Sequence, residues 1–136
     1  MYANGKGVPE NDKTAVKWFT KAAEQGYAKA QYNLSNMYAR GDGVPENHKT
    51  AVSWLTKAAK QGNAKAQTNL GIEYERGSCV LTDNRRAYMW YSIDSYNGNE
   101  LGGKNKDKIA KNMTPADISK AQDMSSRCLE SNYTDC

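Results

Sequence analysis

Residues 41–76 read GDGVPENHKTAVSWLTKAAKQGNAKAQTNLGIEYER, and residues 5–40 read GKGVPENDKTAVKWFTKAAEQGYAKAQYNLSNMYAR. The two stretches carry the same residue at 25 of 36 paired positions. A repeat period of about 20–50 residues is typical of solenoid proteins, whose units bury their apolar faces only against one another. We therefore expect stacked helical units that offer a long concave surface and no single deep crevice.

Composition is compatible with one soluble-type domain. The chain has 136 residues and a formal net charge of +4, from 19 basic and 15 acidic side chains. Charges of both signs are mixed along the sequence, which is typical of a solvated surface and argues against nucleic-acid binding. No apolar run approaches the roughly 20 residues that span a bilayer, so we expect no membrane insertion. The chain also shows no signal peptide, but a mature exported protein would look the same.

Each repeat contains the patterns of two helices. The first begins near Ala28 and stops at Gly41, and its apolar positions recur at helical spacing. The second is predicted from about Lys49 to Gln61, with Gly62 as its C-terminal stop. The apolar stripe of the first helix comprises Ala30, Leu34, Met37 and Tyr38. The stripe of the second comprises Ala51, Trp54, Leu55, Ala58 and Ala59, and each Trp is expected to fill the space between the short Ala side chains.

This pattern resembles the Sel1-like repeat, a relative of the tetratricopeptide repeat with a longer loop between its two helices. The resemblance is carried by Ala30, Leu34, Tyr38, Gly41, Gly43, Val44, Ala51, Trp54, Ala58, Ala59 and Gly62. The same register returns in part at Gly77, Val80, Ala87, Trp90 and Gly98. It implies an all-α fold, a right-handed α/α superhelical solenoid of antiparallel helix pairs, with repeats at about 5–40 and 41–76 and a degenerate third at 77–112.

Both ends of the chain depart from the repeat. In the third copy Asp94 and Ser95 replace the Ala pair, and we expect such relaxed packing positions at the end of a stack. Segment 113–136 follows, with a predicted capping helix that has Thr114 as N-cap, Pro115 at its first position and Asp117 at its third.

At the other end, Met1 and Tyr2 align with Met37 and Tyr38, which leaves the first helix of the second kind with an open face. Either the chain is a piece of a longer protein, or a second copy covers this face in a homodimer.

Three cysteines bear on the compartment. Many bacterial Sel1-like proteins end with a pair like Cys128 and Cys136, so the resemblance implies a disulfide between them. A disulfide implies an oxidising periplasmic or secreted setting, with Cys79 left free. The alternative is a cytoplasmic scaffold with three reduced thiols, in which Cys128 is a small core residue.

The differences between the two near-identical repeats suggest a binding surface. Within the first helix they include positions 32, 35, 36 and 39, which share one helical face. In the tetratricopeptide fold this face lines the concave groove and contacts peptides. The resemblance therefore implies a groove for a protein partner formed by Lys29, Tyr32, Asn36, Arg40, Lys65, Thr68, Ile72, Glu75 and Arg76. Tyr32 and Ile72 would be its apolar anchors, outside the packing stripe, so that charged substitutions there should spare the fold. The alternative is that unselected surface has drifted.

Catalytic patterns are missing from the sequence. The single histidine, His48, is expected to be an exposed, N-cap-like residue, and no zinc set, nucleophile with base, or phosphate-binding loop stands out. We expect no cofactor and no enzyme activity. The leading hypothesis is a non-enzymatic adaptor or scaffold that binds a peptide or protein surface in the concave groove. Alternatives are an immunity or inhibitor protein that neutralises a toxic bacterial effector, and a weak enzyme or a receptor for a small, cell-wall-related ligand.

Overall fold

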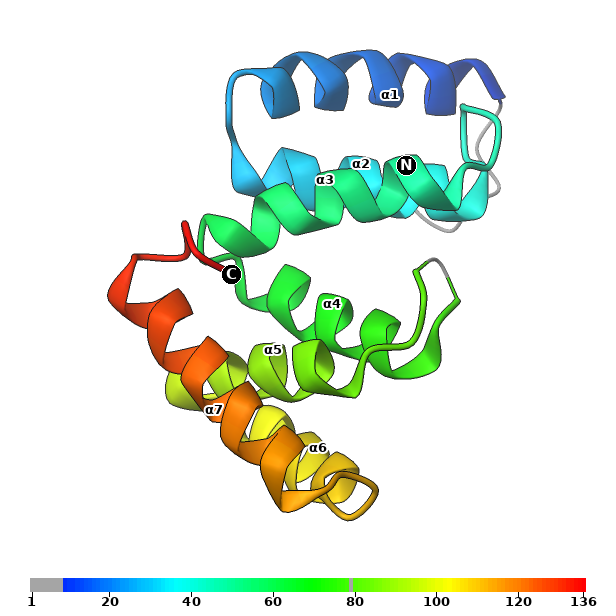
Figure 1. Ribbon diagram of the computed structural model, residues 1–136. Helices are drawn as coiled ribbons and strands as arrows, with labels where there is room; N and C mark the ends of the chain where they lie inside the picture. The colour runs from blue at the N-terminus through cyan, green and yellow to red at the C-terminus, as the bar shows by residue number, and fades with distance from the viewer. Residues whose placement is uncertain (1–8, 79) are drawn as a thin grey trace.

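A computed structural model describes residues 9–78 and 80–136. Over these residues the protein is all-α, and Figure 1 shows the helices stacked in chain order from α1 at one end to α6 and α7 at the other. The helices are α1 (Pro9–Glu24), α2 (Ala28–Arg40), α3 (His48–Lys60), α4 (Ala64–Arg76), α5 (Asn84–Tyr96), α6 (Glu100–Ala110) and α7 (Pro115–Glu130). The predicted all-α solenoid is confirmed. None of the described helices is long and apolar enough to cross a membrane. The predictions about Met1, Tyr2 and Cys79 concern positions outside the described residues.

The helices of successive repeats begin and end at equivalent positions of the sequence. The side chain of Asn47 caps α3 by accepting a hydrogen bond from the Thr50 backbone N–H at 3.0 Å, and Asp83 caps α5 in the same way. His48 is therefore the first helical residue, one position after the cap rather than the cap itself, and it is exposed. At the other end, Gly41 closes α2 with φ 76°. Glycine adopts this left-handed conformation without steric cost, which is why the helix stops there.

Buried glutamines connect successive helices. Gln31 Nε2 donates to the Ala23 carbonyl at 3.1 Å, and its Oε1 accepts from Gln61 Nε2 at 2.7 Å. One repeat later, Gln67 Nε2 donates to the Ala59 carbonyl at 3.1 Å, and its Oε1 accepts from Asn97 at 3.1 Å. Each amide thus pairs with the preceding helix and with the end of the following one, which fixes the spacing of the stack.

The three equivalent tryptophans are buried to very different extents. Trp90 is 2% exposed and packs in a cluster with Leu55 and Leu70 of the preceding helices. Trp54 is half-buried against the cluster that contains Leu34. Trp18 is 66% exposed, contrary to the expectation that every Trp fills space between helices. Each covered tryptophan lies against the helix pair before it, and α1 is the first helix described.

The third repeat is tightly packed, which corrects the expectation of relaxed positions. Asp94 is 1% exposed, and its Oδ2 accepts hydrogen bonds from Thr68 Oγ1 at 2.8 Å and Asn99 Nδ2 at 2.9 Å. Helix α6, for which the sequence offered no apolar stripe, packs against α5 at Gly102. A Cβ on Gly102 would lie 2.7 Å from the Tyr91 carbonyl oxygen, so the two backbones approach closely only because this residue is glycine.

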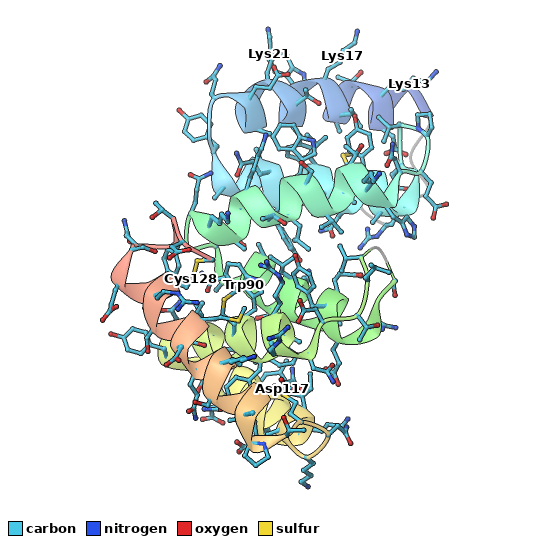
Figure 2. All side chains as sticks on the ribbon, viewed as in Figure 1. Lys13, Lys17, Lys21, Trp90, Asp117 and Cys128 are labelled. Atoms are coloured by element: carbon cyan, nitrogen blue, oxygen red, sulfur yellow. A yellow bond between two sulfur atoms is a disulfide. The ribbon has the colours of Figure 1, made fainter. Side chains whose placement is uncertain are left out.

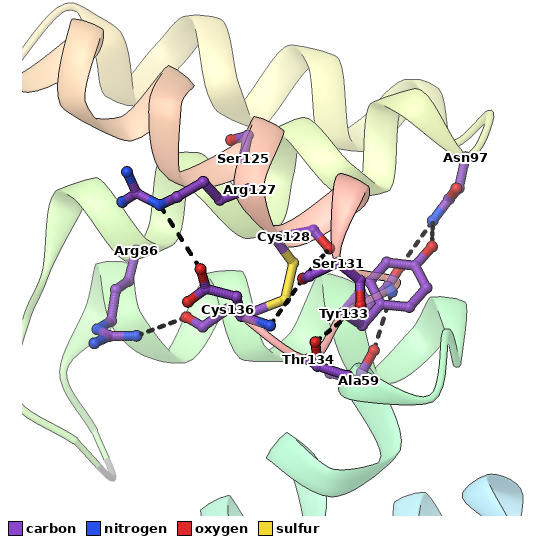
Figure 3. Close-up of a disulfide and its surroundings, with 12 residues drawn as sticks. Ala59, Arg86, Asn97, Ser125, Arg127, Cys128, Ser131, Tyr133, Thr134 and Cys136 are labelled. Carbon is purple, nitrogen blue, oxygen red and sulfur yellow. Dashed lines mark hydrogen bonds and ion pairs between the residues drawn. A yellow bond between two sulfur atoms is a disulfide. The ribbon is translucent and has the colours of Figure 1, made fainter.

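The capping helix and the disulfide are confirmed. Thr114 Oγ1 accepts from the Asp117 N–H at 3.1 Å, as predicted for the start of α7. Figure 3 shows the chain folding back after α7 so that Cys136 bonds to Cys128, with a Cα–Cα distance of 4.6 Å. Arg86 Nη1 of α5 donates to the Cys136 carbonyl at 3.1 Å. The disulfide therefore ties the C-terminal tail to α7, and the arginine ties it to α5.

Candidate binding groove

A hollow of about 200 Å³ lies between α2 and α4, with α3 along its floor. Both walls belong to the first helix of a repeat, the helix whose outer face was expected to line a groove. Its lining residues are Ser35, Asn36, Ala39, Ala51, Val52, Leu55, Asn69, Ile72, Glu73 and Arg76. Apolar side chains of α3 and polar side chains of α2 and α4 therefore meet in one place.

Only part of the predicted groove set lines this hollow. Asn36, Ile72 and Arg76 do so. The exposed side chains of Lys29, Arg40 and Lys65 do not, and they lie towards the ends of their helices.

Three other predicted groove residues are held by contacts within the protein. The Tyr32 hydroxyl accepts a hydrogen bond from Asn69 Nδ2 at 3.2 Å. Thr68 donates to the buried Asp94. Glu75 Oε1 accepts from the Tyr91 hydroxyl at 2.5 Å. Each bond joins one repeat to the next, so these side chains contribute to packing.

Much of the difference between the first two repeats follows from the third. Tyr91 and Asp94 stand where the second repeat has Leu55 and Ala58. The larger Tyr91 requires Gly71 beside it, because a Cβ there would lie 2.8 Å from the Tyr91 ring. Burial, together with the hydrogen bond to Glu75 and its negative charge, raises the pKa of the Tyr91 phenol above its usual range. The changes at positions 68, 71 and 75 thus match a different neighbour rather than a ligand.

The expectation that Tyr32 and Ile72 lie outside the packing is wrong. Tyr32 is half-buried and packs against the cluster that contains Leu70 and Trp90. Ile72 is half-buried and packs against the cluster that contains Tyr88. A glutamate at either position would place a charge against apolar side chains, so such substitutions perturb the fold as well as the groove.

Several hollow-lining residues escaped the comparison of repeats. Asn69 and Val52 have identical counterparts in the first repeat, Asn33 and Val16, and a search for differences passes over them. Glu73 does differ from its counterpart Met37, but position 37 does not share the helical face formed by positions 32, 35, 36 and 39. Glu73 was therefore not among the predicted groove residues. The structure brings it into the hollow because α4 packs on α3 with residues 69, 72, 73 and 76 on the near side.

A second, broader hollow of about 820 Å³ adjoins the first, and Val52 lines both. It lies between α3 and the loop after α4, and includes Tyr74 and Val80. Leu81 of the same loop is 91% exposed. An apolar surface therefore continues from the small hollow towards the end of α4.

The Sel1 repeat family matches residues 1–27, 28–63 and 64–93. This chain belongs to the Sel1 repeat family. Proteins of this family are generally protein–protein interaction modules and are typically non-enzymatic. No curated protein matches the chain.

Two solved structures share the Sel1 fold over most of the chain. One is c5321, described as a protective antigen present in uropathogenic Escherichia coli strains, with 34% identity and a TM-score of 0.87 over 97% of this chain. The other is a Sel1 repeat protein from Oxalobacter formigenes, with 37% identity and a TM-score of 0.69 over 77% of this chain. The chain spans 29% of the first protein's length and 43% of the second's.

The outer face of α1, the first helix of the described residues, is basic and partly apolar. Figure 2 shows Lys13, Lys17 and Lys21 pointing away from the stack along α1. A hollow of about 530 Å³ on this face is lined by Thr14, Val16, Lys17, Trp18, Thr20 and Lys21. The Lys21 ammonium lies 5.7 Å from the Trp18 ring centroid. Coverage of this face by a second copy stays a prediction.

Proposed function

We propose that this Sel1 repeat chain is a non-enzymatic adaptor that holds a segment of another protein in the groove between α2 and α4. The observation that carries the proposal is the hollow in which the polar side chains of Asn36, Asn69 and Glu73 meet the apolar Val52 and Ile72. A mixture of apolar contact area and a few convergent polar groups is what gives a binding site both affinity and orientation.

The first hollow by itself is smaller than a usual small-molecule site, and the adjoining depression of about 820 Å³ extends over the surface between α3 and the loop after α4. Small-ligand sites usually enclose about 300–1,000 Å³, and the hollow holds about 200 Å³, which suits one side chain. The adjoining surface at Val52 and Leu81 offers further apolar contact area to a longer segment. A bound peptide would place one side chain in the hollow and lay its neighbours over the broader depression.

A random peptide library displayed on phage tests the proposal and does not require that the natural partner be identified. Wild-type protein is expected to select peptides that no longer bind when Ala39→Arg fills the hollow from α2. Ser53→Arg is the matched control, because it adds the same side chain at an exposed position of α3 that lines neither hollow. Circular dichroism establishes that both variants keep their helices. Peptides that bind wild type and Ala39→Arg equally would rule out this groove.

We also propose that the protein works in an oxidising compartment, the periplasm or the extracellular space. The disulfide between Cys128 and Cys136 supports this, because structural disulfides persist mainly in such settings. Intact source cells are treated with a membrane-permeant thiol reagent before lysis, and labelling of each cysteine is read by mass spectrometry. Cys136, which is only half-buried, is expected to react only after reduction, whereas the buried Cys128 is shielded from the reagent in either state. Labelling of Cys136 in cells that have not been reduced would contradict the proposed location.

A further inference from the structure

Glu73 and Asp94 are the two described acidic residues with a buried side-chain oxygen that lacks a donor, and of the two only Glu73 lines the hollow. Its Oε2 is inaccessible to solvent and receives no hydrogen bond from residues 9–78 and 80–136. In the first repeat the same position is Met37, which packs against the cluster that contains Leu34. A carboxylate oxygen that is buried without a donor destabilises the folded state, because it has lost its water and gained no hydrogen bond in return. The second repeat therefore carries an unfavourable group where the first has an apolar one.

A second acceptor lies one helical turn away. Asn69 precedes Glu73 by four residues on α4, so the two side chains share one face of the helix. Asn69 Nδ2 donates a hydrogen bond to the Tyr32 hydroxyl at 3.2 Å. This bond orients the amide and leaves the Asn69 Oδ1 available as an acceptor. The described residues give that oxygen no hydrogen bond. At residues 69 and 73 the α4 wall of the hollow thus presents acceptors, which suit a ligand that brings donors, while Arg76 presents a donor at the end of the same wall.

The remaining walls suit an aliphatic stem. Ala39 and Ile72 flank the hollow from α2 and α4, and Val52 lies on its floor. Lysine and arginine bury their methylene stems against apolar surface while the charged end meets polar groups. At about 30 Å³ per water molecule, the volume of the hollow equals six or seven waters, enough for one long side chain. The volume of the hollow and its lining therefore both suit a Lys or Arg side chain.

We propose that the hollow receives one basic side chain, Lys or Arg, from the bound protein segment, with its cation on Glu73 and Asn69. This inference rests on the proposed groove function. A cation in the hollow would pair with the Glu73 carboxylate, which would turn about its terminal bond to bring the unpartnered oxygen to the ligand. Hydrogen bonds between charged groups are about twice as strong as neutral ones. Arg76 also lines the hollow, but its side chain is exposed and free to turn outward. The competing occupant is a carboxylate held by Arg76 and Asn36.

The test uses the full 136-residue chain and the strongest peptide from the display selection. Affinities are measured by titration calorimetry for wild type and for Glu73→Gln, each with the peptide and with a version whose basic residue is replaced by glutamine. We expect the selected peptides to share a basic residue, and its loss to weaken wild-type binding about tenfold or more. In Glu73→Gln the same peptide change should have little further effect, because the paired carboxylate is already gone.

Stability gives an independent readout. Glu73→Met restores the residue of the first repeat and removes the unpaired oxygen, so we expect a higher urea midpoint together with weaker peptide binding. If Glu73 only stabilised the fold, Glu73→Met would lower both the urea midpoint and the peptide affinity.

The outcomes separate the inference from the function on which it rests. Peptides that are blocked by Ala39→Arg but bind Glu73→Gln as tightly as wild type would overturn the basic-side-chain inference and leave the groove function standing. Selected peptides that depend on a carboxylate and on Arg76 would do the same. If Ala39→Arg blocks no peptide, the groove function fails and the inference fails with it.

Discussion

Gln67 is the clearest example of a buried polar residue that holds two repeats together. It is fully buried, and it bonds both to the Ala59 carbonyl and to Asn97. Gln67→Ala removes the side-chain hydrogen bonds to the Ala59 carbonyl, which keeps only the Gly62 N–H as a donor, and to Asn97, and it opens a gap, so we expect a loss of about 1–3 kcal/mol in the free energy of unfolding. Urea unfolding followed by circular dichroism measures this. Lys65→Ala, at an exposed site on the same helix, should change stability by no more than about 0.5 kcal/mol.

Tyr91 gives the protein a specific sensitivity to alkaline pH. Its pKa in the folded state is raised above the ordinary value near 10, chiefly by burial and also by Glu75. Above pH 10, and below the raised pKa of the folded state, the unfolded chain loses the phenol proton while the folded protein keeps it. The unfolded state is therefore favoured as pH rises through this window. Each pH unit in this window should remove about 1.4 kcal/mol from the free energy of unfolding.

The control for this effect is Tyr91→Phe, which cannot titrate. At neutral pH the variant should be less stable than wild type because the hydrogen bond to Glu75 is lost. Above pH 10 the gap between the two proteins should narrow. A gap that stays constant from neutral to alkaline pH would show that Tyr91 is not the responsible group.

At the level of residues, the surface predicted from the sequence overlaps the hollow in part, and its use as a binding groove stays a prediction. A face with period i, i+3, i+4 and i+7 follows from helix geometry alone, and Asn36 and Ile72 do line the hollow. The same reasoning cannot tell a residue that differs because of a ligand from one that differs because its neighbour differs. Thr68 and Glu75 belong to the second kind, since their partners Asp94 and Tyr91 come from a distant part of the chain.

Among the elements, helices with strong local signals were predictable and α6 was not. The starts of α3, α4 and α7 follow short polar caps, and α2 ends at a glycine with positive φ, all of which depend on a few adjacent residues. Helix α6 also starts after a polar cap, Asn99, but it has two adjacent glycines and few apolar residues. It is stable because Gly102 admits the backbone of α5 and because Ile109 is buried there. Such tertiary stabilisation leaves no periodic pattern in the sequence.

The disulfide is expected to stabilise the end of the solenoid through α7 and its tail. Closing a loop of this length lowers the conformational entropy of the unfolded chain, which raises the free energy of unfolding by about 2–3 kcal/mol. Cys136→Ser should therefore lower the melting temperature and free the segment around Tyr133, whose hydroxyl accepts from Asn97. Calorimetry with and without a reducing agent checks this. Reduction should lower the stability of wild type and leave Cys136→Ser unchanged, whereas equal effects on both would exclude the disulfide as the cause.

Across the whole molecule, burial is uneven from one end of the stack to the other. Equivalent tryptophans are 66% exposed in α1 and 2% exposed in α5. The difference follows from position, since each helix of this kind is covered by the pair that precedes it. The α2–α4 groove lies between these extremes, where two repeats already support each other. Among the described residues, the face of α1 that carries Trp18 is therefore the least covered of the three equivalent helix faces.

A homodimer through α1 would have to overcome charge repulsion. Lys13, Lys17 and Lys21 all point outward on this face, so two copies placed face to face would bring like charges together. Salt screens such charges, shortening their range from about 10 Å at 0.1 M to about 3 Å at 1 M.

Dimerisation measured by sedimentation velocity should therefore strengthen with salt. It should also strengthen at low salt in Lys17→Ser, which copies Ser53 of the second repeat, and disappear in Trp18→Glu. A protein that stays monomeric at every salt concentration, with Trp18 fluorescence typical of an exposed indole, would rule out self-association by this face. An acidic or neutral helix would match the lysine row better than a second α1 does.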